Sequence, residues 1–325
     1  MLTCEICGNS ERNINHNAKE LMFGFADEFI YVECGKCGCL RLMDPPFDMA
    51  KYYPDSYGPH NASSKRLRTL TYLLHILKGK YFTGKWRLIT NLIIGVFPWK
   101  MPIIKPCDNV YNKKILDVGC GNGARLIELA ADGFLSLYGV DPNIGDDIVS
   151  NSSETDNPYI KKSEIFDVND KYDIIMFNHS LEHMYEHEKV LLHAKSILTD
   201  DGYLIIRFPT VSSTAWSKYR EHWYALDPPR HVFLHSLKSI EILAKKCGYE
   251  ITDIISETVS NITLSKLYRI GLDRKQQRKF LKTPRGILMR VLNLPSKFFA
   301  PRVGKSDRIR LYLRKSGGTQ DGHKL

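Results

Sequence analysis

The 325-residue sequence lacks a long uninterrupted apolar run. Its longest apolar stretch, Leu88 to Trp99, contains Thr90, Asn91 and Gly95. That stretch is about half the ~20 residues that a membrane-spanning helix requires. The first residues also lack the apolar segment of a secretory signal peptide, because cysteine and glutamate stand there instead. These absences argue against membrane-spanning and secreted classes, and we expect a cytoplasmic protein.

Acidic residues are nearly absent from two stretches of the chain. Residues 65–105 hold nine Lys or Arg and no Asp or Glu, and residues 265–325 hold seventeen Lys or Arg against three acids. The two stretches carry net charges of +9 and +14, which is +23 together. Since the whole chain carries a formal net charge of +10, the remainder of the chain carries −13. Such asymmetry indicates contact with a polyanion or with an anionic membrane surface. The alternative is that the basic stretches pack against the acidic remainder.

Glycine is concentrated after one predicted strand. Residues 115–118 have the pattern of a short buried strand, and Gly119, Gly121 and Gly123 follow it before a helical stretch. Glycine lets the backbone approach a ligand closely, and a helix N-terminus offers free N–H groups. The next strand ends in Asp141, an acid placed to accept hydrogen bonds from ribose hydroxyls. The pattern indicates a nucleotide-binding turn.

The run from Asp117 to Gly123 reads D-x-G-x-G-x-G and resembles motif I of class I S-adenosylmethionine (SAM) methyltransferases. The glycines do not match a dinucleotide fingerprint, which needs two residues between its last two glycines, whereas only Asn122 separates them here. The resemblance implies that the turn holds the amino acid and ribose portions of SAM, that Asp117 orients the turn, and that Asp141 accepts the ribose hydroxyls. An ordinary strand, turn and helix without a ligand is the alternative.

Later segments continue an alternation of strands and helices. Strands are expected at 172–178, 203–208, 249–255 and 307–313, helices at about 185–198 and 236–247, and a turn at 201–202. This alternation indicates an α/β fold with a parallel sheet covered on both faces. The resemblance covers about residues 111–315. It implies a Rossmann-like, seven-stranded SAM methyltransferase sheet in which Phe166 and Asp167 contact the adenine and Asn178 faces the methionine end.

Histidines follow the strand at 172–178. An acceptor hydroxyl must lose its proton during transfer, and histidine is the usual base near neutral pH. His183 and His231 are the two candidate catalytic bases, although His183 could instead cap the following helix. His179, Glu182 and His183 also have a spacing compatible with metal binding. Because His179 stands where related metal-dependent enzymes have a carboxylate, we expect no catalytic metal.

The N-terminal segment contains two C-x-x-C knuckles, Cys4 with Cys7 and Cys34 with Cys37. Four thiolates complete a tetrahedral zinc site and leave no position for water, so the predicted zinc is structural. A pair of disulfides is the alternative, but thiols stay reduced in the cytosol. Cys39 is an alternative ligand to Cys37. The arrangement resembles the zinc ribbon that precedes SAM methyltransferase domains in bacterial glycan-modifying enzymes, and a ribbon also precedes some ribosomal RNA methyltransferases.

These patterns divide the chain into four stretches. Residues 1–60 are expected to form the zinc ribbon and a connector, and residues 61–110 a basic helical linker or lid. Residues 111–260 are expected to form the SAM-binding core. Residues 261–325 are expected to contain a basic helical insertion, a final strand at about 307–315 and a flexible tail.

The loop after the strand at 203–208 gathers aromatic rings with charged and histidine side chains, a combination that suits sugar rings. Its members are Trp216, Tyr219, Arg220, His222, Trp223, Tyr224, Asp227, Arg230, His231 and His235. A hydrophobic clasp on the sheet edge is the alternative interpretation of this cluster.

Together with the ribbon, the loop favours SAM-dependent O- or C-methylation of a saccharide, nucleotide-sugar or glycolipid in surface polysaccharide biosynthesis. The basic stretches would then contact anionic lipid at the inner face of the membrane. Two other functions stay open. One is an RNA methyltransferase whose ribbon and basic tail bind the phosphate backbone. The other is a non-catalytic SAM-binding scaffold. The sequence does not predict the oligomeric state.

Overall fold

The structure is a computed structural model that describes residues 3–54, 103–105, 107–149, 158–257, 262–292 and 305–317. Most of the predicted linker or lid at 61–110, including the apolar stretch Leu88 to Trp99, lies outside these residues. Most of the predicted tail does too. Across the described part of the chain, no helix is long and apolar enough to cross a membrane.

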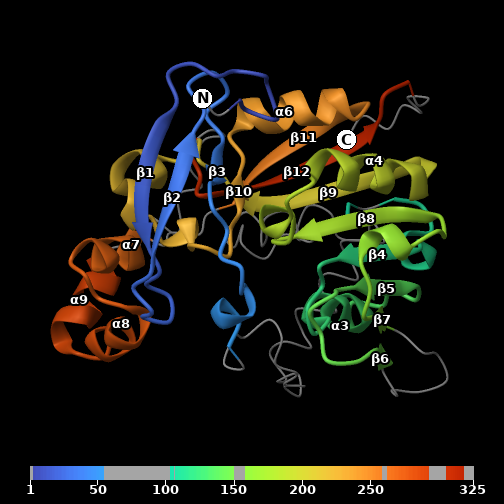
Figure 1. The fold of residues 1–325 in the computed structure, drawn as a ribbon. Coiled ribbons are helices and arrows are strands. Elements are labelled where there is room, and N and C mark those ends of the chain that lie inside the picture. Colours follow the sequence, from blue (N-terminus) through green and yellow to red (C-terminus); the bar gives the residue numbers. More distant parts are fainter. Residues whose placement is uncertain are drawn as a thin grey trace.

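A mixed eight-stranded sheet forms the centre of the fold (Figure 1). In spatial order its strands are β11 (Tyr249–Glu257), β12 (Arg308–Lys315), β9 (Leu198–Pro209), β8 (Tyr172–Asn178), β4 (Ile115–Val118), β5 (Leu137–Val140), β7 (Tyr159–Lys161) and β6 (Ile148–Val149). The pairs from β9 to β7 are parallel, whereas β12 is antiparallel to both of its neighbours. The predicted seven-stranded sheet is confirmed, with the two-residue β6 added at one edge.

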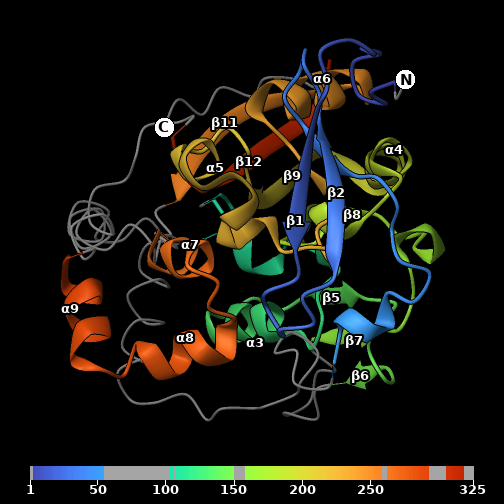
Figure 2. The ribbon, with the colours of Figure 1, turned by 60° about the vertical axis from the view of Figure 1, so that its left-hand side comes forward.

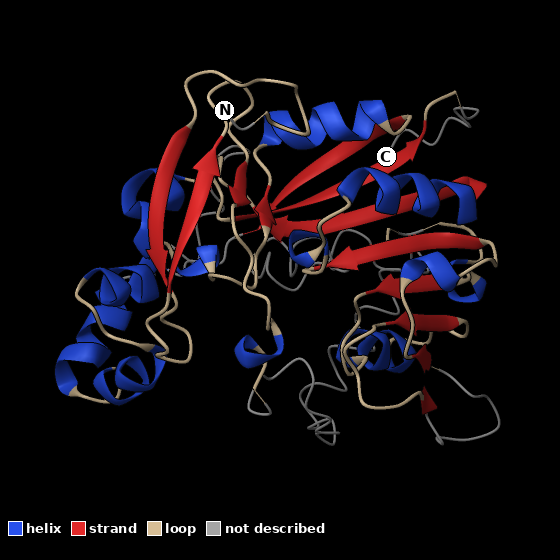
Figure 3. Cartoon of the chain, in the orientation of Figure 1, coloured by secondary structure: helices blue, strands red, loops and turns tan. Residues whose placement is uncertain are grey.

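Alternate residues of the central strands belong to two separate cores. Leu116 and Ile175 face one core together with helices α4 (His187–Ile197) and α6 (Leu237–Lys246). Ile115 and Ile174 face the other core with α3 (Ala124–Ala131). Strands covered on both faces are mostly apolar, and all four residues of β4 are buried, three of them apolar and the fourth Asp117. Figure 3 shows these helices flanking the red strands.

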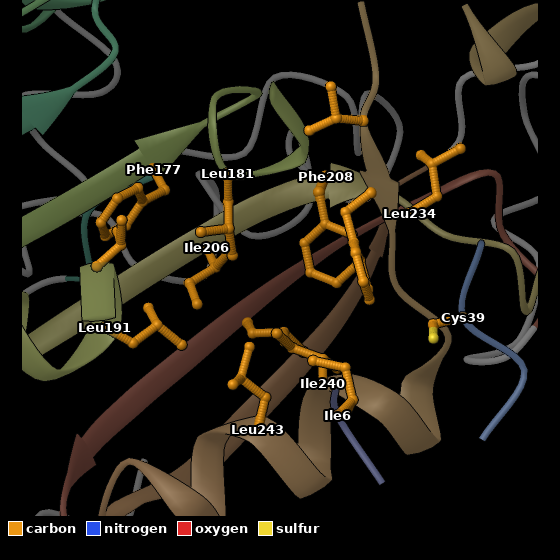
Figure 4. Close-up of a cluster of buried hydrophobic side chains, with 14 of the residues drawn as sticks. Ile6, Cys39, Phe177, Leu181, Leu191, Ile206, Phe208, Leu234, Ile240 and Leu243 are labelled. Carbon is orange, nitrogen blue, oxygen red and sulfur yellow. The ribbon is translucent and has the colours of Figure 1, made fainter. Parts of the chain in front are cut away.

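The first core is built mainly from branched aliphatic and aromatic side chains. Figure 4 shows Ile240 and Leu243 of α6 directed toward Ile206 and Phe208 of β9. Helix α6 begins with a capping box, in which the Ser236 hydroxyl accepts from the Ser239 backbone N–H at 2.9 Å. Ile240 and Leu243 are almost completely buried, so this helical face holds α6 on the sheet.

One predicted turn is wrong. Asp201 and Gly202 do not separate a helix from a new strand, because β9 runs without a break from Leu198 to Pro209. The ladder accommodates them through an irregularity opposite Tyr172 and Ile174 of β8. The paired residues of β9 pass from Leu198 to Tyr203, so Asp201 and Gly202 lie in an irregular part of one strand and not in a turn between two elements.

A second, four-stranded sheet joins the N-terminal segment to the core. Its order is β1 (Ile14–Lys19), β2 (Glu28–Glu33), β3 (Leu40–Leu42) and β10 (Phe233–Leu234). Strand β10 comes from the loop after β9, far away in sequence. A single apolar cluster continues from Cys4 and Tyr31 to Phe208 and α6. The N-terminal segment is therefore packed into the same core, and the four-part division of the chain stays a prediction.

The C-terminal basic stretch begins with helices and ends, where it is described, with strand β12. It contains α7 (Ile262–Arg269), α8 (Arg274–Phe280) and α9 (Pro284–Leu292). Figure 2 shows α8 and α9 along one side of the molecule, away from α4. The remaining helices are short: α5 (Thr214–Tyr219), η1 (Ala50–Tyr52), η4 (Val110–Asn112), η5 (Ile165–Asp167), η6 (Leu181–His183), η7 (Arg220–His222) and η8 (Tyr224–Leu226).

Candidate active site

A pocket of about 700 Å³ opens at the carboxyl ends of β4, β5 and β8. The glycine turn after β4 and the residues after β5 line one part of it, η5 contributes Phe166, and η6 with His231 lines another part. Tyr53, from the segment after η1, also lines the pocket. This volume is in the range of small-molecule and cofactor sites, and the edge of the sheet is where α/β folds bind ligands.

The glycine turn has a backbone that side chains would disrupt. Gly119, Gly121 and Gly123 all have positive φ, at 71°, 54° and 73°. A Cβ on Gly119 would lie 2.4 Å from the Cβ of Ser180, and one on Gly123 would lie 2.1 Å from Ile160. Gly119 and Gly121 line the pocket. Gly123 does not line the pocket. Close contact with Ile160 of β7 is enough to require glycine at this position, without any contact to a ligand.

Asp117 is buried at the base of this turn, and its Oδ1 has no hydrogen-bond partner. Burial raises the pKa of its carboxyl to about 7, although the nearby Arg125 charge opposes that rise. A buried carboxylate oxygen that lines a pocket requires a donor or a cation. SAM carries a methyl group on a sulfonium centre and also an ammonium group, so the residues present fit this cofactor.

Asp141 connects the end of β5 to the glycine turn. Its Oδ2 accepts from the Gly121 N–H at 2.8 Å, and its Oδ1 accepts from the Asn143 N–H at 2.8 Å. The side chain lines the pocket, and each carboxylate oxygen retains capacity for a second donor. The predicted contact with ribose hydroxyls is compatible with this geometry and stays a prediction.

The other three predicted cofactor residues differ in position. Phe166 is 40% exposed and lines the pocket, as expected of an adenine wall. Asn178 also lines the pocket, and its Oδ1 accepts from Arg207 at 3.1 Å. Asp167 is not part of the described lining, because its carboxylate accepts from the Glu164 N–H in a capping box.

The two candidate bases meet in the pocket. The rings of His183 and His231 lie 4.7 Å apart in an edge-to-face arrangement. Burial lowers the pKa of His183 to about 3, reinforced by His231, and burial also lowers the pKa of His231. Such histidines are neutral but weak bases at neutral pH. Burial raises the pKa of the adjacent Glu182 to about 8. The catalytic role of the two histidines stays a prediction.

Charges behind the pocket form a network that the sequence did not lead us to expect. Glu257 of β11 accepts from Arg207 at 2.6 Å and from Arg310 at 2.9 Å, and it pairs with Arg308 at 3.0 Å. Arg308 donates to His179 Nε2 at 2.8 Å. The alternation of arginines along the final strand was the available signal, because it placed Arg308 and Arg310 on one face of the sheet.

The loop cluster predicted to stack on sugar rings is largely internal. Trp216, Trp223 and Tyr219 are at most 4% exposed, and Arg230 is fully buried. Among the described members of that cluster, His231 alone lines the pocket. The hydrophobic-clasp interpretation therefore describes this loop, and it does not offer a sugar-stacking surface.

Four N-terminal thiols converge as the C-x-x-C spacing predicts. Ligand atoms of Cys4, Cys7, Cys34 and Cys37 all lie within 4.8 Å of one another. Cys4 and Cys37 have their sulfurs 3.7 Å apart, and Cys7 and Cys34 have theirs 3.6 Å apart. Zn–S bonds of about 2.3 Å in a tetrahedron set sulfurs about 3.8 Å apart. Cys39 lies 3.5 Å from Cys37 and stays an alternative ligand. The thiols fit a zinc ion, which itself stays a prediction.

Comparison with known families decides the enzyme class. Residues 102–254 match the family model described as a methyltransferase domain. These residues form a class I methyltransferase domain. The prediction of a class I SAM-dependent methyltransferase is thus confirmed. The chain is similar in fold to the magnesium protoporphyrin IX methyltransferase of Synechocystis PCC 6803 with bound SAH. That structure has 14% identity and a TM-score of 0.41, over 78% of this chain and 90% of that one.

Two curated relatives are both named tRNA U34 carboxymethyltransferase. The protein from Photobacterium profundum is 22% identical over 250 residues, 67% of this chain and 69% of its own length. The protein from Pseudomonas fluorescens is 47% identical over 45 residues, so the match spans only 14% of either chain. The prediction of a saccharide or glycolipid acceptor in polysaccharide biosynthesis is therefore wrong, because the relatives are named for an RNA acceptor.

Proposed function

We propose that this protein transfers a methyl group from SAM to an RNA, with tRNA as the substrate class. The observation that carries the proposal is the name shared by both curated relatives, one of which aligns with two thirds of this chain. The donor chemistry follows from the methyltransferase domain, and the acceptor from those names.

The donor end of the pocket is assigned to the glycine turn and its acids. In this proposal Asp117 faces the donor's ammonium group, Asp141 accepts from the ribose hydroxyls and Phe166 covers the adenine. Transfer of a methyl group is an in-line displacement, so the protein contributes mainly by alignment of the two reactants. Rigid attachment of the turn through the bond from Gly121 to Asp141 supports that alignment.

The acceptor surface is assigned to the basic helices α7 to α9. Residues 262–292 hold nine Lys or Arg and one acid, Asp273. Asp273 is used internally, since its carboxylate accepts from the Gln276 N–H at 2.8 Å and caps α8. Basic side chains here include the exposed Arg278, Lys279 and Lys282. Figure 1 shows α7 to α9 on the left, the side toward which the β8 arrow points, and the pocket opens at that carboxyl end of β8.

The test is transfer of a labelled methyl group from SAM to total tRNA, combined with a gel shift. We expect label in tRNA and a single modified nucleoside whose added mass is that of a methyl group. A triple variant, Arg278→Gln, Lys279→Gln and Lys282→Gln, should weaken RNA binding. Each lost phosphate contact lowers the slope of log K against log salt by about 0.7–0.9, so the triple variant should lower it by about 2–3.

The matched control removes three charges from another face. Lys189, Lys245 and Lys246 lie on α4 and α6 and are exposed. Their replacement by Gln lowers the net charge equally and should leave the salt slope unchanged. If both variants lowered the salt slope equally, the effect would come from net charge alone and not from contacts between RNA and the basic helices. Absence of any tRNA shift and of label in RNA, with binding to anionic vesicles in flotation, would refute an RNA acceptor.

A further inference from the structure

Three side chains with metal-binding atoms meet beside the donor end of the pocket. One ligand atom each from Glu182, His183 and His231 lies within 4.8 Å of the other two. Glu182 and His183 come from η6, whereas His231 comes from the loop after β9. All three line the 700 Å³ cavity. Their convergence is produced by the tertiary fold, and sequence spacing does not reveal it.

Backbone carbonyls fix the hydrogen positions on both rings. His183 Nδ1 lies 2.8 Å from the Arg230 carbonyl, and His231 Nδ1 lies 2.8 Å from the Ala225 carbonyl. A carbonyl oxygen only accepts, so both Nδ1 atoms carry hydrogen and donate. Each Nε2 of these neutral rings is then left with a lone pair. A hydrogen bond from Nδ1 to a backbone carbonyl is the contact that orients histidine ligands at metal sites.

The carboxylate between them is only half satisfied. Arg308 donates to His179 Nε2 at 2.8 Å, which leaves His179 Nδ1 as a donor to Glu182 Oε1 at 3.1 Å. Glu182 Oε2 is buried and has no partner, and the residue is 1% exposed. His231 Nε2 stands 4.0 Å from Glu182 Oε1. When Glu182 is ionised, two lone pairs and an unpartnered carboxylate oxygen are all acceptors, so their proximity is unfavourable unless a proton or a metal cation lies among them.

We propose that Glu182, His183 and His231 bind one divalent transition-metal ion within the pocket. Two neutral imidazoles and a carboxylate are a set that suits Zn²⁺ and its neighbours in the first transition row. Three protein ligands leave coordination positions open, as in catalytic sites, and these positions face the cavity. They would accept an oxygen atom of the acceptor. The proposal does not depend on which acceptor is methylated.

The sequence pattern around Glu182 and His183 offers His179 as the third metal ligand, at a position where a carboxylate would be needed. The structure directs both nitrogens of His179 to Arg308 and Glu182, so His179 supports the carboxylate from outside. In the structure His231 takes the place of His179 as the third ligand. The backbone carbonyl of His231 accepts a hydrogen bond from Tyr31 Oη at 2.8 Å.

The test is titration of the full chain with Co²⁺, read by visible absorption and by calorimetry. Cobalt bound to the four thiolates gives intense thiolate charge-transfer bands, whereas cobalt at Glu182, His183 and His231 gives ligand-field bands without them. We expect the wild type to bind one equivalent of cobalt that gives ligand-field bands without thiolate charge-transfer bands. Glu182→Gln and His231→Ala should each weaken that equivalent at least tenfold and leave the thiolate bands intact.

His222→Ala is the matched control, since His222 lies in the neighbouring η7, outside the pocket lining that the structure describes. It should bind both equivalents as the wild type does. Glu182→Gln keeps the shape of the side chain, and a far-ultraviolet spectrum checks the fold of each variant. Absence of a non-thiolate equivalent in the wild type, or equal affinity for it in folded Glu182→Gln and the wild type, would overturn the proposal. RNA methylation by a protein without this equivalent would leave the proposed function standing and remove only the metal.

Discussion

Substitution of Arg230 by Met should be among the most damaging single changes in this protein. The Arg230 guanidinium is fully buried and donates four hydrogen bonds to three residues. Its Nε reaches Asp227 at 3.0 Å, one terminal nitrogen donates to the Tyr52 carbonyl at 3.0 Å, and the other donates to Asp227 and to Glu20, the latter at 3.2 Å. Glu20 is itself fully buried. One cation therefore serves two carboxylates and joins the N-terminal segment to the loop that carries His231.

The magnitude follows from what Met leaves behind. Burial alone would raise the pKa of Asp227, but the charge and hydrogen bonds of Arg230 hold it below its usual value. Without the guanidinium, two buried carboxylates lose their counter-ion, although Glu20 keeps the N–H groups of Phe23, Gly24 and Phe25 at 2.9–3.0 Å. Removal of one partner from a buried ion pair costs about 3–5 kcal/mol. Since whole proteins are stable by only about 5–15 kcal/mol, this is a large fraction of the total.

The assay is urea unfolding followed by circular dichroism and tryptophan fluorescence, with Arg220→Met as the control. Arg220 lies in the same loop, but its side chain is 45% exposed and pairs with Glu33 at 3.3 Å. An exposed pair contributes about 0–1 kcal/mol, so the control should change the free energy of unfolding by no more than that. If Arg230→Met lost less than about 1 kcal/mol, or no more than Arg220→Met, the argument from a buried shared cation would be refuted.

Three further predictions concern the cofactor and the thiols. Burial raises the pKa of Asp117 to about 7, and a cationic methyl donor needs the ionised carboxylate. SAM affinity should therefore be constant above pH 7 and fall up to tenfold per pH unit below it. Calorimetry should find no such pH dependence in Asp117→Asn. Asp141→Ala loses hydrogen bonds to a charged acceptor worth ~1.5–3 kcal/mol each, so it should weaken SAM binding about 10–100-fold for each bond lost, and unchanged affinity would remove Asp141 from the site. One zinc per chain should copurify and be lost in Cys34→Ser, and elemental analysis without zinc in the wild type would contradict the ribbon.

Local patterns predicted the parts of the fold that local physics determines. Glycine at 119, 121 and 123 is required by positive φ and by close packing, and those constraints act within a few residues. The apolar strands and the amphipathic α6 follow from periodicity in the same way. The C-x-x-C spacing placed four sulfurs at tetrahedral separations because each knuckle is a short turn. The prediction failed at Asp201 and Gly202, which lie in an irregular part of the continuous strand β9 and not in a turn between two elements.

The parts that could not be predicted join residues roughly two hundred positions apart. Glu20 meets Arg230, Tyr31 holds the carbonyl of His231, and β10 pairs with β3. No periodicity encodes such contacts, since each depends on how the loop after β9 folds back on the N-terminal hairpin. The consequence for the site is direct. The loop that presents His231 to the pocket is fastened to the four-cysteine segment by a buried ion pair and a strand ladder. Loss of zinc is therefore expected to disturb the acceptor end of the pocket as well as the four-cysteine segment.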